Sequence, residues 1–211
     1  MKNLLVIFFI CAFNLLCNAQ VFDGYGIKAG WGITNYDWQY GAPINGKLIW
    51  DNNSGFSIRA FTDFSLYRYI GMEAEIGYAQ KGAKYKIPFT TNSQPDGTGE
   101  YVDINNRLNY LSFSAVGKFK YDMSLISPYI IIGPQYNYLL SKQVSSLDKI
   151  VYNKFKNSSL GIVLGAGLEI KVLSVDFIAE YLYARDVTNN YNQSNIEIKN
   201  YSHTFLIGIK I

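Results

Sequence analysis

The sequence is poor in cysteine and in long apolar runs. Its two cysteines, Cys11 and Cys17, both lie among the first twenty of 211 residues. A chain that loses this segment has no thiol for a disulfide, a zinc site or a cysteine nucleophile. The formal net charge is only +3 and no basic run occurs, which argues against a nucleic-acid partner. After the N-terminal segment, no apolar stretch reaches the roughly 20 residues that a membrane-spanning helix requires.

The first nineteen residues have the pattern of a secretory signal peptide. Lys2 gives a basic start, residues 4–16 are apolar apart from Asn14, and Ala19 places a small residue at the cleavage site. A lipidated Cys17 is disfavoured because the bulky Leu16 precedes it. We therefore expect cleavage after Ala19. The mature chain, residues 20–211, should fold as one domain, since no linker or shift of composition divides it.

A regular alternation of side-chain type distinguishes residues 70–82. Met72 and Ile76 fall on one face of an extended chain, and Glu73 and Glu75 fall on the other. A half-buried strand of a soluble sheet has the same pattern. At least six other segments repeat it, however, with small and charged residues together on the polar face. That combination favours a barrel with lipid outside and a charged interior.

Eight such segments follow one another along the chain. They are predicted at about residues 25–34, 56–64, 70–82, 108–121, 129–140, 160–171, 175–184 and 204–211. The fifth is the least regular, because residues 130–132 are apolar on both faces and Pro134 donates no hydrogen bond, so a bulge or a locally unpaired position is expected there.

The connections between these segments alternate in length. The long ones are residues 35–54, 83–106, 141–157 and 186–200. Transmembrane barrels have this asymmetry because one set of turns is periplasmic and the other projects from the cell. The predicted fold class is all-β, an eight-stranded antiparallel up-and-down transmembrane β-barrel. A soluble, lipocalin-like barrel is the alternative fold.

Aromatic residues supply a second test, because Tyr and Trp favour the membrane interfaces. Two outward-facing belts are expected. The periplasmic belt would contain Tyr25, Phe64, Phe119, Tyr121 and Tyr129, and the outer belt Phe56, Tyr78, Tyr136, Tyr138, Tyr181 and Tyr183.

Charged residues on the opposite faces are predicted to point into the barrel. An eight-stranded interior is just wide enough to be filled by side chains, and buried charges must be paired. We therefore expect a plugged interior, in which Arg59 lies nearly opposite Glu75. An acid/base site or an ion path is the functional alternative. The twelve interior charges are Lys28, Arg59, Asp63, Glu73, Glu75, Lys118, Lys120, Glu169, Lys171, Asp176, Glu180 and Lys210.

Residues for catalysis are scarce. The single histidine, His203, is expected on the lipid side of the eighth strand, whereas its neighbour Ser202 points inward, so the two should not form a nucleophile and base pair. The chain is expected not to be an enzyme and to need no cofactor or metal. A lipid-modifying enzyme and a small pore remain as alternatives.

The segment Tyr78-Ala79-Gln80-Lys81-Gly82 resembles a signature of the PorT-like outer-membrane β-barrel family. Supporting features are Ser127-Pro128-Tyr129, Gly133-Pro134, the glycines between residues 161 and 167, and the polar-aromatic residues 200–205. The resemblance covers essentially the whole mature chain. It implies an eight-stranded outer-membrane barrel, some relatives of which are linked to type IX protein secretion. One departure is the last residue, Ile211, where such barrels commonly have an aromatic residue.

These observations together predict a non-enzymatic integral barrel of the outer membrane that displays four long loops, with a binding, structural or secretion-accessory role. The expected partners are outer-membrane lipid, the barrel-assembly machinery during insertion, and a secretion-complex or surface protein. The barrel is expected to be a monomer.

Overall fold

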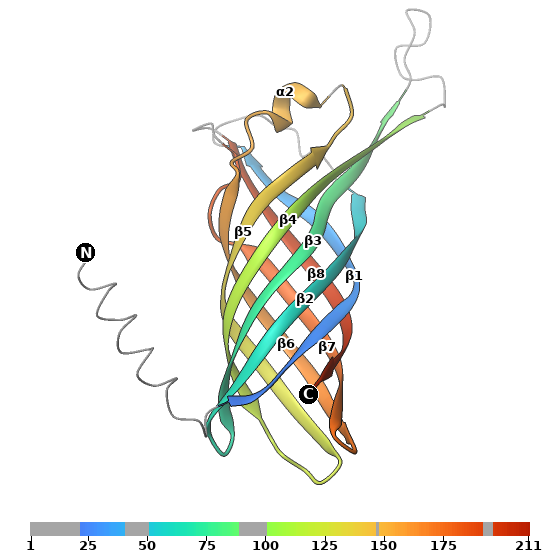
Figure 1. Cartoon of the computed structure of the whole chain (residues 1–211). Helices are drawn as coiled ribbons and strands as arrows, with labels where there is room; N and C mark the ends of the chain where they lie inside the picture. The colour runs from blue at the N-terminus through green and yellow to red at the C-terminus, as the bar shows by residue number, and fades with distance from the viewer. Residues whose placement is uncertain (1–21, 41–50, 89–100, 147, 192–195) are drawn as a thin grey trace, which may run out of the picture.

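The computed structural model of the chain describes residues 22–40, 51–88, 101–146, 148–191 and 196–211. The predicted signal peptide lies outside these residues. Within them the chain forms eight strands and one short helix (Figure 1), and that helix is not long and apolar enough to cross a membrane. The elements are β1 (Phe22–Tyr40), β2 (Asp51–Tyr67), β3 (Ile70–Pro88), β4 (Tyr101–Lys120), β5 (Ile126–Gln143), α2 (Lys149–Tyr152), β6 (Ser158–Val172), β7 (Val175–Asp186) and β8 (Ile196–Lys210).

The strands form a closed antiparallel barrel in which each strand pairs with its neighbours in sequence and β1 pairs with β8. The connections after β2, β4 and β6 lie at one end of the barrel, which we call the short-turn end (Figure 1). The C-terminal residue lies there too, since the Tyr25 amide donates to the Ile211 carbonyl over 3.1 Å. Helix α2 lies at the opposite, loop end. The predicted fold class is confirmed.

Several strands are longer at the loop end than the sequence predicts. Strand β1 continues to Tyr40, β4 begins at Tyr101 and β8 begins at Ile196. Apolar alternation stops where a strand leaves the hydrocarbon, but the backbone hydrogen bonds between strands do not depend on side-chain polarity. The ladder therefore extends past the residues that the hydrophobic pattern could locate.

Apolar side chains cover the outside of the barrel. Trp31 is 70% exposed and Ile207 is 74% exposed, although both lie in mid-strand. Charged residues such as Lys28 and Glu73 are almost fully buried inside. This is the reverse of a soluble protein, in which isolated charges are kept in water, and it matches a wall that is solvated by lipid.

Strand β5 corrects one prediction. Tyr129, expected in the outward periplasmic belt, is only 3% exposed and points into the barrel, as does the fully buried Ile131. Ile130 and Ile132 face outward instead. The β4–β5 pairing is interrupted near Pro134, between the pairs Ser114–Gln135 and Gly117–Ile132, without a change of register, so Pro134 is a locally unpaired position in this ladder and not a bulge. The continuous apolar run gave no alternation from which to assign the inward face.

Candidate functional site

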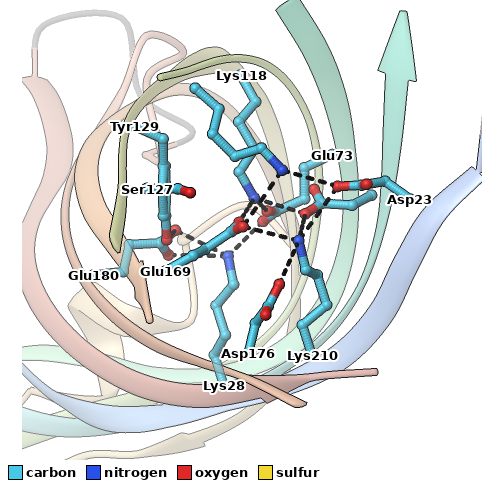
Figure 2. Close-up of polar contacts among 12 residues, drawn as sticks. Asp23, Lys28, Glu73, Lys118, Ser127, Tyr129, Glu169, Asp176, Glu180 and Lys210 are labelled. Atoms are coloured by element: carbon cyan, nitrogen blue, oxygen red, sulfur yellow. Dashed lines mark hydrogen bonds and ion pairs between the residues drawn. The ribbon is translucent and has the colours of Figure 1, made fainter. Parts of the chain in front are cut away.

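Lys28 lies at the centre of the polar network inside the barrel (Figure 2). Its ammonium Nζ is 2.5 Å from Glu73 Oε1, 3.1 Å from Glu75 Oε1 and 2.9 Å from Glu180 Oε2. It also lies 4.6 Å from the centroid of the Phe61 ring. These carboxylates come from β3 and β7, on either side of β1 and its neighbours, so the network ties opposite walls of the barrel together.

A second group of ion pairs lies nearer the short-turn end. Lys118 Nζ is 2.7 Å from Asp63 Oδ2 and 2.6 Å from Glu169 Oε1, and Lys210 Nζ is 2.9 Å from Glu169 Oε2. Lys118 also contacts Glu73 at 3.1 Å, which joins this group to the Lys28 cluster. In Figure 2 the side chains of Lys118, Glu169 and Lys210 point toward one another from different strands.

Arg59 and Glu75 form the pair that the sequence predicts. Arg59 Nη1 lies 2.7 Å from Glu75 Oε2. The strand register sets Arg59 opposite Gly77 rather than Glu75, so the ion pair is diagonal. The Ser114 hydroxyl donates to the same Glu75 oxygen over 2.8 Å. Glu75 is therefore fully engaged by groups from β1, β2 and β4.

Three of the twelve predicted interior charges lie at the edge of this network. Lys120 is 13% exposed and Asp176 is 21% exposed, and each still contacts a buried partner, Glu169 and Lys210 respectively. Lys171 was expected inside, but its side chain is 42% exposed and lies 3.8 Å from Asp122 in the β4–β5 turn. It is one residue from the end of β6, so it belongs to the rim.

Two residues of the network were missed by the sequence analysis. The Tyr129 hydroxyl donates to Glu180 Oε2 over 2.7 Å, and its ring lies 4.4 Å from Lys118 Nζ. Asp23 accepts from Lys120 over 3.1 Å and from Lys210 over 3.3 Å. Asp23 precedes the predicted first strand, and Tyr129 lies in the segment without alternation, so neither had a pattern to reveal it.

The Tyr78 to Gly82 motif links the wall of the barrel to its outer mouth. Tyr78 faces outward and hydrogen-bonds Gln80, whereas Lys81 is buried and lies 3.8 Å from Asp186. The Gly82 amide donates to the Thr34 hydroxyl over 2.9 Å. A β-carbon at Gly82 would lie 2.1 Å from the Asn106 carbonyl oxygen. Glycine is therefore required here by the close approach of β4.

The described part of the loop between β5 and β6, residues 144–146 and 148–157, folds over the outer mouth, and we call it the cap. Its Tyr152 and Phe155 rings stack with centroids 4.6 Å apart. They pack in a buried cluster that includes Tyr36 and Tyr191, from β1 and the β7–β8 loop. Figure 1 shows α2 above this end of the barrel. Burial raises the pKa of the Tyr152 hydroxyl above its ordinary value.

Polar contacts fix the cap in place. The buried Asp148 carboxylate accepts from the Tyr85 hydroxyl over 2.6 Å and from the Asn106 amide. Lys142 Nζ donates to the Tyr152 carbonyl over 2.8 Å. A loop held by both aromatic packing and charge-assisted hydrogen bonds is pre-organised, which lowers the entropic cost of binding through it.

His203 and Ser202 lie on opposite faces of β8. Ser202 is buried, and His203 Nδ1 lies 2.6 Å from the Tyr181 hydroxyl on the outer wall. The structure thus separates these two groups. Among the described residues, no three His, Cys, Asp or Glu side chains are arranged to hold a metal ion.

The chain is similar to known proteins of the outer membrane. A family model described as "Outer membrane protein beta-barrel domain" matches residues 18–184. The outer membrane protein OprG from Pseudomonas aeruginosa superposes with a TM-score of 0.52 at 10% identity, over 91% of this chain and 97% of OprG. Neisserial surface protein A gives a TM-score of 0.49 at 16% identity, over 89% of this chain and 96% of its own. No curated protein matches the chain.

Proposed function

The chain belongs to the outer membrane protein beta-barrel domain family and is a barrel of the outer membrane, and we propose that it acts there as a closed binding platform. The observation that carries this proposal is closure at two levels. Ion pairs among groups such as Lys28, Lys118 and Glu73 fill the middle of the barrel, and the cap packs on its outer mouth. Both features support a closed interior over the continuous water-filled path that a pore needs.

The cap supplies the binding surface in this proposal. Its acidic residue, Asp148, is turned inward and is engaged by Tyr85 and Asn106. Its lysines Lys149, Lys154 and Lys156 are exposed. A pre-organised surface with outward charge of one sign favours an anionic partner at the cell surface. A secretion-accessory role, as the PorT-like resemblance implies, is the narrower version of this proposal.

Two experiments test the proposal. Purified protein in planar bilayers should give no steady conductance, and a stable open channel in the wild type would overturn the closed state. Photo-cross-linking from the exposed cap position Asn153 in living cells should capture a surface partner. The same probe placed at Met123, in the exposed turn at the short-turn end, is the matched control. Cross-links to secretion-complex subunits from Asn153 alone would support the secretion role, and equal capture from both positions would contradict binding through the cap.

A further inference from the structure

An apolar groove of about 850 Å³ lies on the lipid-facing wall across β4 to β8. Two outward alanines form it. Ala166 on β6 lies between its strand partners Ile130 on β5 and Tyr181 on β7. Ala179 on β7 lies between Leu168 on β6 and Ile207 on β8. Each alanine thus leaves a recess between bulky neighbours. The volume lies in the range of roughly 300–1,000 Å³ that is typical of small-molecule sites.

Aromatic rings and a cation lie at the short-turn end of this groove. Tyr69 and Tyr121 line it, and their rings stack 5.6 Å apart with an interplanar angle of 10°. Arg68 does not itself line the groove, but its exposed guanidinium lies 5.2 Å from the ring centroid of Tyr69, which does. Lys120 also lines the groove, but its ammonium is paired with Asp23 and Glu169. No carboxylate of the described chain is within ion-pair distance of Arg68. The groove therefore passes from an apolar recess in the hydrocarbon to a tyrosine pair and a cation at the membrane interface.

We propose that this groove binds one glycerophospholipid of the periplasmic leaflet. The short-turn end of such barrels faces the periplasm, so lipid enters the groove from that leaflet. An acyl chain lies over Ala166 and Ala179, and the phosphodiester accepts hydrogen bonds from Arg68, whose planar guanidinium suits phosphate. The tyrosines lie at headgroup depth, where amphipathic rings are favoured. This site is independent of the cap.

A second groove on the wall provides an internal comparison. It measures about 690 Å³ and lies across β1, β2, β3 and β8, where Ala60, Ala74 and Ile209 are among its lining residues. Tyr25 and Phe61 are the aromatic residues in its lining, and no lysine or arginine lines it. With an apolar surface but no cation to hold a phosphate, it should carry only loosely associated lipid.

Native mass spectrometry of the purified barrel with added phosphatidylglycerol tests the proposal. The wild type should keep one phospholipid under conditions that strip the others. Ala179→Phe fills the recess and should abolish retention, whereas the control Ala74→Phe, in the second groove, should not. Arg68→Gln should weaken phosphatidylglycerol binding roughly ten- to a hundredfold, as for a lost charge-assisted bond. The same variant should leave retention of diacylglycerol, which lacks phosphate, unchanged.

Three outcomes would overturn the proposal. The first is equal retention in the wild type and in Ala179→Phe. The second is equal loss in Ala179→Phe and Ala74→Phe, which would indicate general lipid contact. The third is a lipid-free dimer that only Ala179→Phe dissociates, which would make the groove an interface between two copies. Each variant must first show the heat-dependent gel shift of a folded barrel.

Discussion

Removal of the Glu75 carboxylate should destabilise the barrel through the charge that it leaves unpaired. In Glu75→Ala, Lys28 keeps Glu73 and Glu180 as partners, but Arg59, whose side chain is only 6% exposed, loses the one ion pair that the described residues give it. Breaking a buried pair in this way costs about 3–5 kcal/mol. The exposed pair Lys86–Asp103 is the control, since Lys86→Ala should cost about 0–1 kcal/mol.

Urea unfolding in lipid vesicles, followed by tryptophan fluorescence and by heat-dependent migration on a gel, measures these differences. The double variant Arg59→Met with Glu75→Ala removes the orphaned charge, and it should recover part of the lost stability. Glu75→Gln should stay close to Glu75→Ala, because it restores polarity but not charge. An unfolding midpoint for Glu75→Ala equal to that of the wild type would refute the pairing, and no recovery in the double variant would refute the stated cause.

Three further perturbations test other parts of the structure. Phe155→Ala removes the ring stacked on Tyr152 and should weaken the packing of the cap by about 3–5 kcal/mol. Trypsin should then cleave the cap faster while the barrel keeps its heat-dependent gel shift. Loss of the gel shift together with the protection of the cap would contradict a local role. Leu173 is fully exposed in the β6–β7 turn and has a φ of 58°, a left-handed conformation that asparagine adopts more easily than leucine. Leu173→Asn should therefore raise the urea midpoint by relieving about 1 kcal/mol of backbone strain, and a lower midpoint would contradict this explanation. A β-carbon at Gly30 would lie 1.8 Å from the Phe205 carbonyl oxygen, where β1 pairs with β8 and closes the barrel. Gly30→Ala should therefore slow refolding, whereas unchanged refolding kinetics would mean that these two strands accommodate the methyl group.

The barrel itself could be predicted because its physical cause repeats along the chain. Every membrane strand must present apolar groups to lipid and small or charged groups to the interior. The alternation of residues such as Ile76 and Glu75 therefore indicates, within a single segment, which side faces lipid. The interior charges follow from the same alternation. Where alternation fails, prediction fails. Tyr129 sits beside three consecutive isoleucines, and its inward direction is set by the β5 register with β4 and β6.

The cap and the rim could not be read from the sequence for a different reason. Tyr152, Phe155 and Tyr191 belong to segments that have no strand period, and they meet only because the closed barrel brings their loops together. Lys171 follows the inward pattern, but it lies where β6 ends, so its ammonium reaches Asp122 instead of the network. Three-dimensional proximity at the ends of strands has no sequence period, so these contacts require coordinates.

The most direct test of the central claim is a nitroxide scan along β6, from Leu160 to Leu168, in lipid vesicles. If the apolar outer wall faces lipid and side chains fill the interior, the accessibility of the nitroxide to oxygen should alternate with a period of two residues. Maxima are expected at the outward positions, such as Ile162, Leu164 and Ala166, and minima at inward positions such as Val163. An inverted pattern, or high accessibility to a water-soluble nickel reagent at Val163, would contradict the account.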